Sequence, residues 1–117
     1  MPAERTLGSV KVANEVIAHI ASLTATQVQG IVGMYPARAR DNHRLLAPTT
    51  SYKGVRVDMG NESLQLELFL VVDSSAHVPT VAAEVQRQVA DAIDKMLGLE
   101  VRQVNVFIGD VRFPGDA

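Results

Sequence analysis

Few side chains in this sequence are spaced so that they could do chemistry together. The three histidines, His19, His43 and His77, stand far apart and lack the H-x-H or H-x3-H spacing that brings two imidazoles to one metal ion. The run 73–75, Asp-Ser-Ser, precedes His77 and holds residue types found in nucleophile clusters. Such a run is more typical of a turn, because a catalytic triad needs a geometry that neighbouring residues rarely supply.

The other reactive residue types lead to the same expectation. The chain has no cysteine, which excludes disulfides, thiolate metal sites and cysteine nucleophiles. It has no phosphate-binding glycine loop and no nucleophile elbow. Two carboxylate pairs, Glu62 with Glu67 and Asp91 with Asp94, fall on a predicted hairpin and on a solvated helix face. We therefore expect a protein that is not an enzyme, with no catalytic residue, cofactor or metal.

The concentrated charge of the sequence lies between residues 38 and 56. This stretch has five basic residues against one acidic residue, whereas the rest of the chain has six basic and twelve acidic residues. Because arginine's planar fork suits carboxylates and phosphates, we predict that the segment docks an acidic partner surface or anionic lipid headgroups. The residues expected to do so are Arg38, Arg40, Arg44, Lys53 and Arg56.

Two other interpretations of this basic segment stay open. Its arginines could pair with the acidic body of the chain, at Asp58 or Glu62, since exposed charges often contribute little. They could also contact RNA, with Tyr35 and Tyr52 at either end of the segment stacking on bases. A net charge of −2 and an aromatic content of 4% argue against nucleic acid.

Composition indicates a single globular domain. The chain has 117 residues, and 47% of them are hydrophobic, which is enough for an aliphatic core. Residues 1–7 lack the apolar stretch of a signal peptide, and no apolar run approaches the roughly 20 residues of a membrane span. A small domain without disulfides favours a reducing compartment, so we expect a cytoplasmic location.

The first half of the chain predicts a strand, a helix, a strand and a loop. Residues 8–12 alternate as in a short strand, and Asn14 is suited to cap a helix over 15–27. Residues 31–35 form a second short strand pattern. The stretch 36–52 holds two prolines and no steady period, so we predict a long loop.

The second half predicts a hairpin, a long helix and a final strand. Residues 54–59 and 63–73 alternate around a turn and predict an antiparallel hairpin. The helix 78–97 has Pro79 in its first turn and ends at a glycine. The last strand, 101–113, changes parity at a glycine, residue 109, which predicts a bulge or a bend.

These elements predict an α+β fold, a two-layer sandwich in which two helices cover one face of a small mixed or antiparallel sheet. The long helix allows a right-handed crossover, so strands 63–73 and 101–113 are expected to be parallel. Phe69, Val71 and Phe107 fall outside the core parity, which leaves a half-apolar second face. That face and the sheet edges predict self-association, unless strand 8–12 or the loop buries them.

Three pairs of sequence blocks follow one another along the chain: GSVKVANEVI (8–17) with VQGIVGM (28–34), GVRV (54–57) with VAAEVQRQV (81–89), and MLGLEV (96–101) with VNVFI (104–108). In their order and spacing these blocks resemble the alkaline-shock-protein family, over residues 8–113. We expect one domain there, with flexible tails at 1–7 and 114–117.

The resemblance implies a cytoplasmic stress protein of Gram-positive-type bacteria that self-associates and reaches the membrane through a small membrane-anchored partner. The family has no established catalytic residues, so none is carried over. This chain departs from the family in 36–52, which is longer and more basic than the usual connection. The expected function is a non-enzymatic scaffold of the cell-envelope stress response. The alternative is an RNA-binding module that uses the basic segment 38–56.

Overall fold

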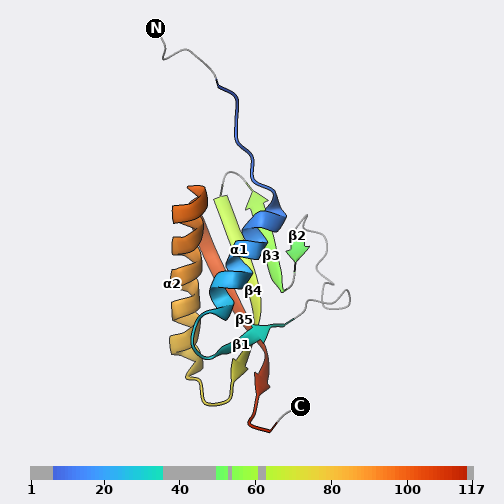
Figure 1. Cartoon of the computed structure of the whole chain (residues 1–117), viewed down its shortest axis with the longest axis vertical. Helices are drawn as coiled ribbons and strands as arrows, with labels where there is room; N and C mark the ends of the chain where they lie inside the picture. Colours follow the sequence, from blue (N-terminus) through green and yellow to red (C-terminus); the bar gives the residue numbers. More distant parts are fainter. Residues whose placement is uncertain (1–6, 36–49, 53, 61–62, 116–117) are drawn as a thin grey trace.

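Two helices and five strands make up the part of the chain that the structure, a computed structural model, describes: residues 7–35, 50–52, 54–60 and 63–115. Both helices cover one face of the sheet (Figure 1), which confirms the predicted two-layer α+β fold. The elements are α1 (Asn14–Thr26), β1 (Ile31–Met34), β2 (Thr50–Tyr52), β3 (Val55–Gly60), β4 (Ser63–Asp73), α2 (Val78–Leu97) and β5 (Val101–Arg112).

The central strand of the sheet is β4. On one side it pairs in parallel with β5 from Leu64 to Asp73. On the other side it pairs antiparallel with β3 along residues 63–68 and with β1 along residues 70–72. β2 extends the sheet beyond β3. The predicted antiparallel hairpin and the predicted parallel pair are both confirmed.

Alternation along β4 builds the core. Five of its side chains point toward the helices and are almost fully buried: Leu64, Leu66, Leu68, Leu70 and Val72. Burying a leucine of this kind contributes about 1.5–3 kcal/mol. From α1 come Ile17 and three alanines, and from α2 come Val85, Val89 and Ile93. The alanines allow α1 to lie close to the sheet, because they add little side-chain bulk.

The long helix has the predicted bounds because its ends are set locally. Pro79 lies in the first turn, where its missing N–H costs no hydrogen bond. Gly98 adopts a left-handed conformation with φ of 70°, and its N–H donates to the Asp94 carbonyl over 2.8 Å. His77 has a local role at the start of the helix, since its Nδ1 lies 2.8 Å from Thr80 Oγ1.

The predicted bulge at Gly109 is confirmed. Ile108 lies opposite Leu70, but Asp110 lies opposite the next residue, Val71, so Gly109 is the extra residue of β5. The bulge returns Val111 to the core side, opposite Val72. A smaller irregularity lies near the start of the same strand, between Val101 and Gln103.

The start of the chain differs from the prediction. Residues 8–12 form no strand within the described part of the chain, and Val10 is 93% exposed. An alternating pattern forms a strand only if a neighbouring strand pairs with it, and residues 8–12 pair with no described strand. Ala13, not Asn14, holds the N-cap position of α1, so the predicted cap was displaced by one residue.

The predicted loop 36–52 was also wrong at its end. Thr50–Tyr52 pairs antiparallel with β3, with Ser51 opposite Arg56. This hairpin turns at Gly54, whose φ of 83° is readily adopted only by glycine. Residues 36–49 lie outside the described part of the chain.

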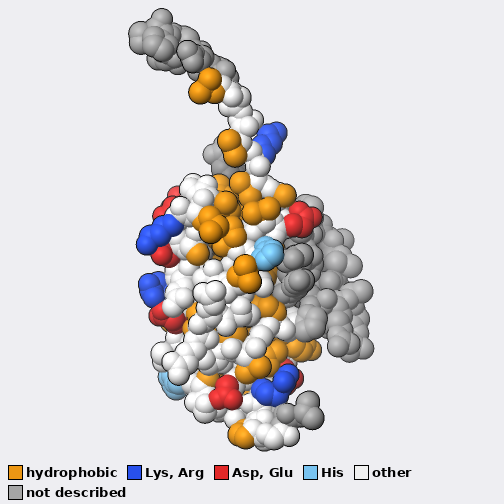
Figure 2. Space-filling model, viewed as in Figure 1, with side chains coloured by type: hydrophobic (Ala, Val, Ile, Leu, Met, Phe, Trp, Pro, Cys, Tyr) orange, Lys and Arg blue, Asp and Glu red, His pale blue; other side chains and the backbone are white. Residues whose placement is uncertain are grey.

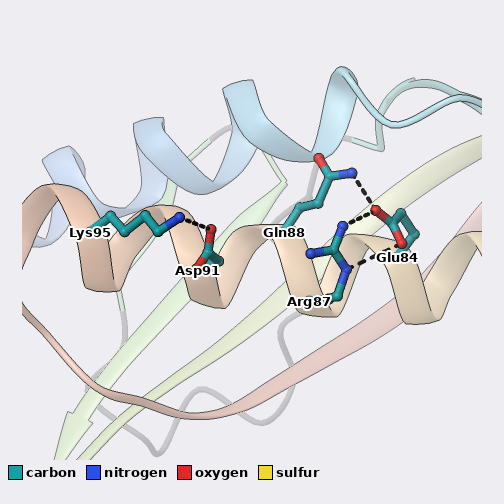
Figure 3. Close-up of polar contacts among 5 residues, drawn as sticks. All are labelled: Glu84, Arg87, Gln88, Asp91 and Lys95. Atoms are coloured by element: carbon teal, nitrogen blue, oxygen red, sulfur yellow. Dashed lines mark hydrogen bonds and ion pairs between the residues drawn. The ribbon is translucent and has the colours of Figure 1, made fainter.

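The outer face of α2 carries the predicted charges of alternating sign. Glu84 accepts hydrogen bonds from Arg87 and Gln88, and Lys95 Nζ lies 3.3 Å from Asp91 Oδ2 (Figure 3). Hydrogen bonds from Arg87 hold the pKa of Glu84 below its usual range, and the same contact raises the pKa of Arg87. In Figure 2, apolar side chains gather instead where α1 begins and α2 ends.

Candidate partner-docking face

The surface of the sheet opposite the helices is formed by the alternate residues that do not enter the core. We call it the open face, because no helix among the described residues covers it. The register places β3, β4 and β5 side chains in rows across it. Its members include Tyr35, Arg56, Asp58, Gln65, Glu67, Phe69, Val71, Gln103, Asn105, Phe107 and Asp110, and at its end Asp73 and the exposed Arg112.

Aromatic rings occupy the middle of the open face. Phe69 and Phe107 lie opposite each other on β4 and β5, and their rings stack with centroids 5.1 Å apart and planes inclined by 17°. Tyr35 follows β1, and its N–H donates to the Phe69 carbonyl over 2.8 Å. The Tyr35 ring lies against Gly109, where a Cβ would overlap it. Three of the five aromatic residues in the chain therefore meet on this surface.

A buried arginine lies beside the rings. Arg56 stands opposite Glu67 in the β3–β4 ladder, and its Nη1 lies 3.7 Å from Glu67 Oε1. Its guanidinium carbon is 5.5 Å from the centroid of the Phe69 ring, within the range of a cation–π interaction. The residue is only 7% exposed, and Glu67 is its ion-pair partner among the described residues.

Acidic groups dominate the accessible charge of the open face. Glu67 keeps 31% of its side chain exposed in the centre, and Asp58 and Asp110 are exposed on the flanking strands. Phe107 is 39% exposed. An apolar aromatic centre with carboxylates around it can receive apolar side chains and, beside them, basic groups.

The structure places one of the five residues predicted to dock an acidic surface. Arg56 faces Glu67 and is buried, so it is not an exposed docking group. Its partner is also neither of the two carboxylates considered from the sequence, Asp58 and Glu62. Arg38, Arg40, Arg44 and Lys53 lie outside the described residues, and their role stays a prediction.

The residues of the open face were only partly found from the sequence. The off-parity positions of Phe69, Val71 and Phe107 indicated a second apolar face. The structure places all three there, but Val71 is buried, with 6% of its surface exposed. Tyr35 was considered only as a residue flanking the basic segment. Its position against Gly109 depends on how β1 lies beside β4, which no local pattern carries.

The run at 73–75 forms a turn, as expected. Asp73 accepts hydrogen bonds from the Ser75 hydroxyl and, over 3.2 Å, from the Ser75 N–H. These bonds hold the pKa of Asp73 below its usual range. His77 contacts Thr80 and not Ser75. Among the described residues, no three His, Asp or Glu side chains are grouped so that they could hold a metal ion.

Neither helix of the described chain is long and apolar enough to cross a membrane. The fold and the open face together define a small α+β domain with one helix-covered sheet surface and one aromatic, acidic surface.

The chain belongs to the alkaline-shock-protein family. Residues 3–113 match the model of this family, which is described as having a "cell envelope-related function". This confirms the family indicated by the sequence blocks, and it identifies the chain as a stress-response protein with a function related to the cell envelope.

Curated relatives agree with this assignment. The chain is 30% identical over 107 residues to YqhY of Bacillus subtilis, covering 92% of this chain and 79% of that protein. It is also 30% identical to YloU of the same organism, over 90% of this chain and 89% of the relative. A stress response regulator gls24 homolog of Streptococcus pyogenes is 27% identical, over 90% of this chain and 59% of the relative.

Solved structures support the fold alone. A copper form of the MamM CTD matches with a TM-score of 0.51 and 16% identity, over 88% of this chain and 90% of that chain. A zinc form of a MamM CTD variant matches with a TM-score of 0.53, also at 16% identity, over 89% and 91%.

Proposed function

We propose that this chain is a non-enzymatic scaffold of the cell-envelope stress response, located in the cytoplasm, which self-associates and reaches the membrane through a protein partner. Membership of the family supports the link to the envelope and to stress. The observation that carries the scaffold is the open face, where Phe107, 39% exposed, stacks on the half-buried Phe69 among carboxylates and no described helix covers the pair.

The chemistry of the open face indicates what kind of partner it receives. Exposed aromatic residues at the centre of a surface often dominate binding energy, because they desolvate a large area at low entropic cost. Glu67, Asp58 and Asp110 repel acidic partners and attract basic ones. We therefore propose a protein segment that places an apolar side chain on the Phe69–Phe107 pair and basic side chains on the carboxylates.

RNA is the rival ligand for this surface. RNA-binding sheets stack bases on exposed aromatic rings, and the open face has such rings. Among the described residues, the cation that contacts these rings, Arg56, is buried against Glu67. The accessible charge of the described face is mostly acidic, which repels a phosphate backbone. The electrostatics of the described residues therefore favour a protein partner.

Site-specific photo-crosslinking distinguishes these ligands. Benzoylphenylalanine is introduced at position 107 and, as a matched control, at position 113, where Phe113 is 58% exposed and lies just beyond β5. Illumination in the native cells is expected to give a discrete protein adduct with the chain labelled at position 107. The chain labelled at position 113 should not give that adduct. An adduct with RNA, or the same adducts from both positions, would contradict the proposal.

A further inference from the structure

The outer edge of β5 has no strand partner among the described residues. β5 is 12 residues long, and it pairs with β4 along one edge only. Unpaired edges of this length are templates for another strand unless they are guarded. The strand contains no proline and no lysine, the residues that commonly block such an edge.

Besides the two irregularities of β5, one side chain protects this edge. The Gln86 amide, on α2, donates to the Val104 carbonyl over 3.0 Å. Because a side chain of α2 reaches the Val104 carbonyl, this carbonyl points away from β4. Backbone groups of alternate residues in a strand point to the same side, so Val106 and Ile108 also present theirs to the outer edge.

We propose that two copies of this chain pair through their β5 edges, antiparallel, about a two-fold axis at Val106. Between its two irregularities β5 is regular over residues 103–108. Pairing about Val106 places Val104 opposite Ile108 of the second copy and Asn105 opposite Phe107. It also keeps core-side residues opposite core-side residues.

Charge selects this register. Arg102 and Asp110 lie at the two irregularities that bound the regular stretch. Counted along the strands, centring the pair on Val106 brings Arg102 of each copy to the level of Asp110 of the other, which allows two opposite-charge pairs related by the two-fold axis. Both side chains are exposed, and neither has an ion-pair partner among the described residues. Centring it on Asn105, the next register that keeps the faces matched, places Arg102 opposite Ile108 and loses both pairs.

The helices leave room for this arrangement. Ala83 and Ala90 lie one turn before and one turn after Gln86, on the side of α2 that faces the β5 edge. Small residues there allow the helices of two copies to approach each other. The inference rests on the proposed self-association. It uses the β5 edge and one carboxylate of the open face, Asp110, so the Phe69–Phe107 pair and Glu67 stay available for another protein.

Charge reversal tests the register directly, by sedimentation velocity over a concentration series. Arg102→Asp and Asp110→Arg are each expected to weaken self-association of the purified full chain by roughly tenfold or more, because each creates two like-charge pairs. The double variant, and an equimolar mixture of the two single variants, should restore it. Folding of each variant is checked by circular dichroism.

Removing the Gln86 side chain should have the opposite effect on self-association. Gln86→Ala frees the Val104 carbonyl and is expected to tighten self-association, whereas the control Gln88→Ala, on the same helix, should leave it unchanged. Because the chain has no cysteine, Asn105→Cys should crosslink two copies with a short bis-maleimide. Arg112→Cys should not, since residues 112 of the two copies would lie roughly 40 Å apart.

The outcomes separate this inference from the proposed function. Two results would overturn pairing through β5 and leave the scaffold intact. Self-association could persist unchanged in both single variants, or it could be weakened in them and not restored in the double variant. A wild-type chain that stays monomeric at high concentration would overturn the pairing and the self-association alike. The partner adduct at position 107 would remain a separate readout of docking.

Discussion

Phe69 and Phe107 stack across the only parallel strand pair of the described sheet, with their ring centroids 5.1 Å apart, on the surface that no described helix covers. A stacked pair on a solvent-facing sheet surface stabilises the fold less than a core pair does, because one side of the rings stays in water. Its placement is therefore better explained by binding than by folding, and the predictions below separate the two roles.

The Arg56–Glu67 pair should behave as a buried charge with one ion-pair partner among the described residues. Glu67→Gln is expected to lower the free energy of unfolding by about 1–3 kcal/mol, because it leaves the buried guanidinium without its carboxylate. Arg56→Met keeps an apolar stem against Phe69 and should cost about 1 kcal/mol or less. Urea denaturation of both single variants and of the double variant measures the coupling energy between Arg56 and Glu67. Equal losses of unfolding free energy in the two single variants would contradict the prediction of a buried charge that depends on its partner.

The Tyr35 ring lies so close to Gly109 that any larger residue at position 109 should destabilise the fold. A Cβ at position 109 overlaps the Tyr35 ring, so Gly109→Ala is expected to destabilise the fold by about 1–3 kcal/mol. The control is Gly33→Ala on β1, where a Cβ meets nothing within 4 Å, and it should change stability by about 0.5 kcal/mol or less. A neutral Gly109→Ala in thermal unfolding would show that the ring does not lie there.

The turn at Asp73 predicts a specific acid dependence. Hydrogen bonds from Ser75 lower the pKa of Asp73 in the folded chain, so the stabilisation is complete above the ordinary carboxyl pKa of about 3.9 and is lost as pH falls below it. Asp73→Asn should remove this part of the pH dependence. Chemical denaturation between pH 6 and pH 3 measures it. Glu84→Gln is the necessary comparison, because the pKa of Glu84 is lowered too.

The basic segment should bind anionic surfaces weakly and in a salt-dependent way. Arg38→Glu, Arg40→Glu and Arg44→Glu together are expected to abolish sedimentation with phosphatidylserine vesicles at low salt, since each basic residue near such a surface adds about 1 kcal/mol. Reversing Lys11, Lys95 and Arg112 changes the net charge equally and should have a smaller effect. Equal losses in both triple variants would mean that total charge, and not this segment, controls binding.

Sequence patterns predicted the elements whose signals are local. The alternation of Leu64 to Val72 gave the central strand, and Pro79 with Gly98 gave both ends of α2, because backbone geometry at those residues depends on few neighbours. The parity change at Gly109 gave the bulge for the same reason.

Features that depend on contacts between residues far apart in the sequence could not be predicted from local patterns. Residues 8–12 have a strand pattern but no neighbouring strand, so the pattern alone misled. Arg56 pairs with Glu67 because of the register of two strands, and it was instead grouped with the arginines near it in sequence. Tyr35 reaches the open face because β1 lies beside the end of β4.

The central claim is that the open face binds a protein partner through Phe107. Once the adduct at position 107 has been identified, the purified partner is titrated by calorimetry against the wild-type chain, Phe107→Asp and Phe113→Asp. We expect Phe107→Asp to weaken binding by roughly 30-fold or more, the effect of losing an aromatic hot spot worth about 2 kcal/mol, while Phe113→Asp binds like the wild-type chain. Equal affinities for all three chains would contradict the account.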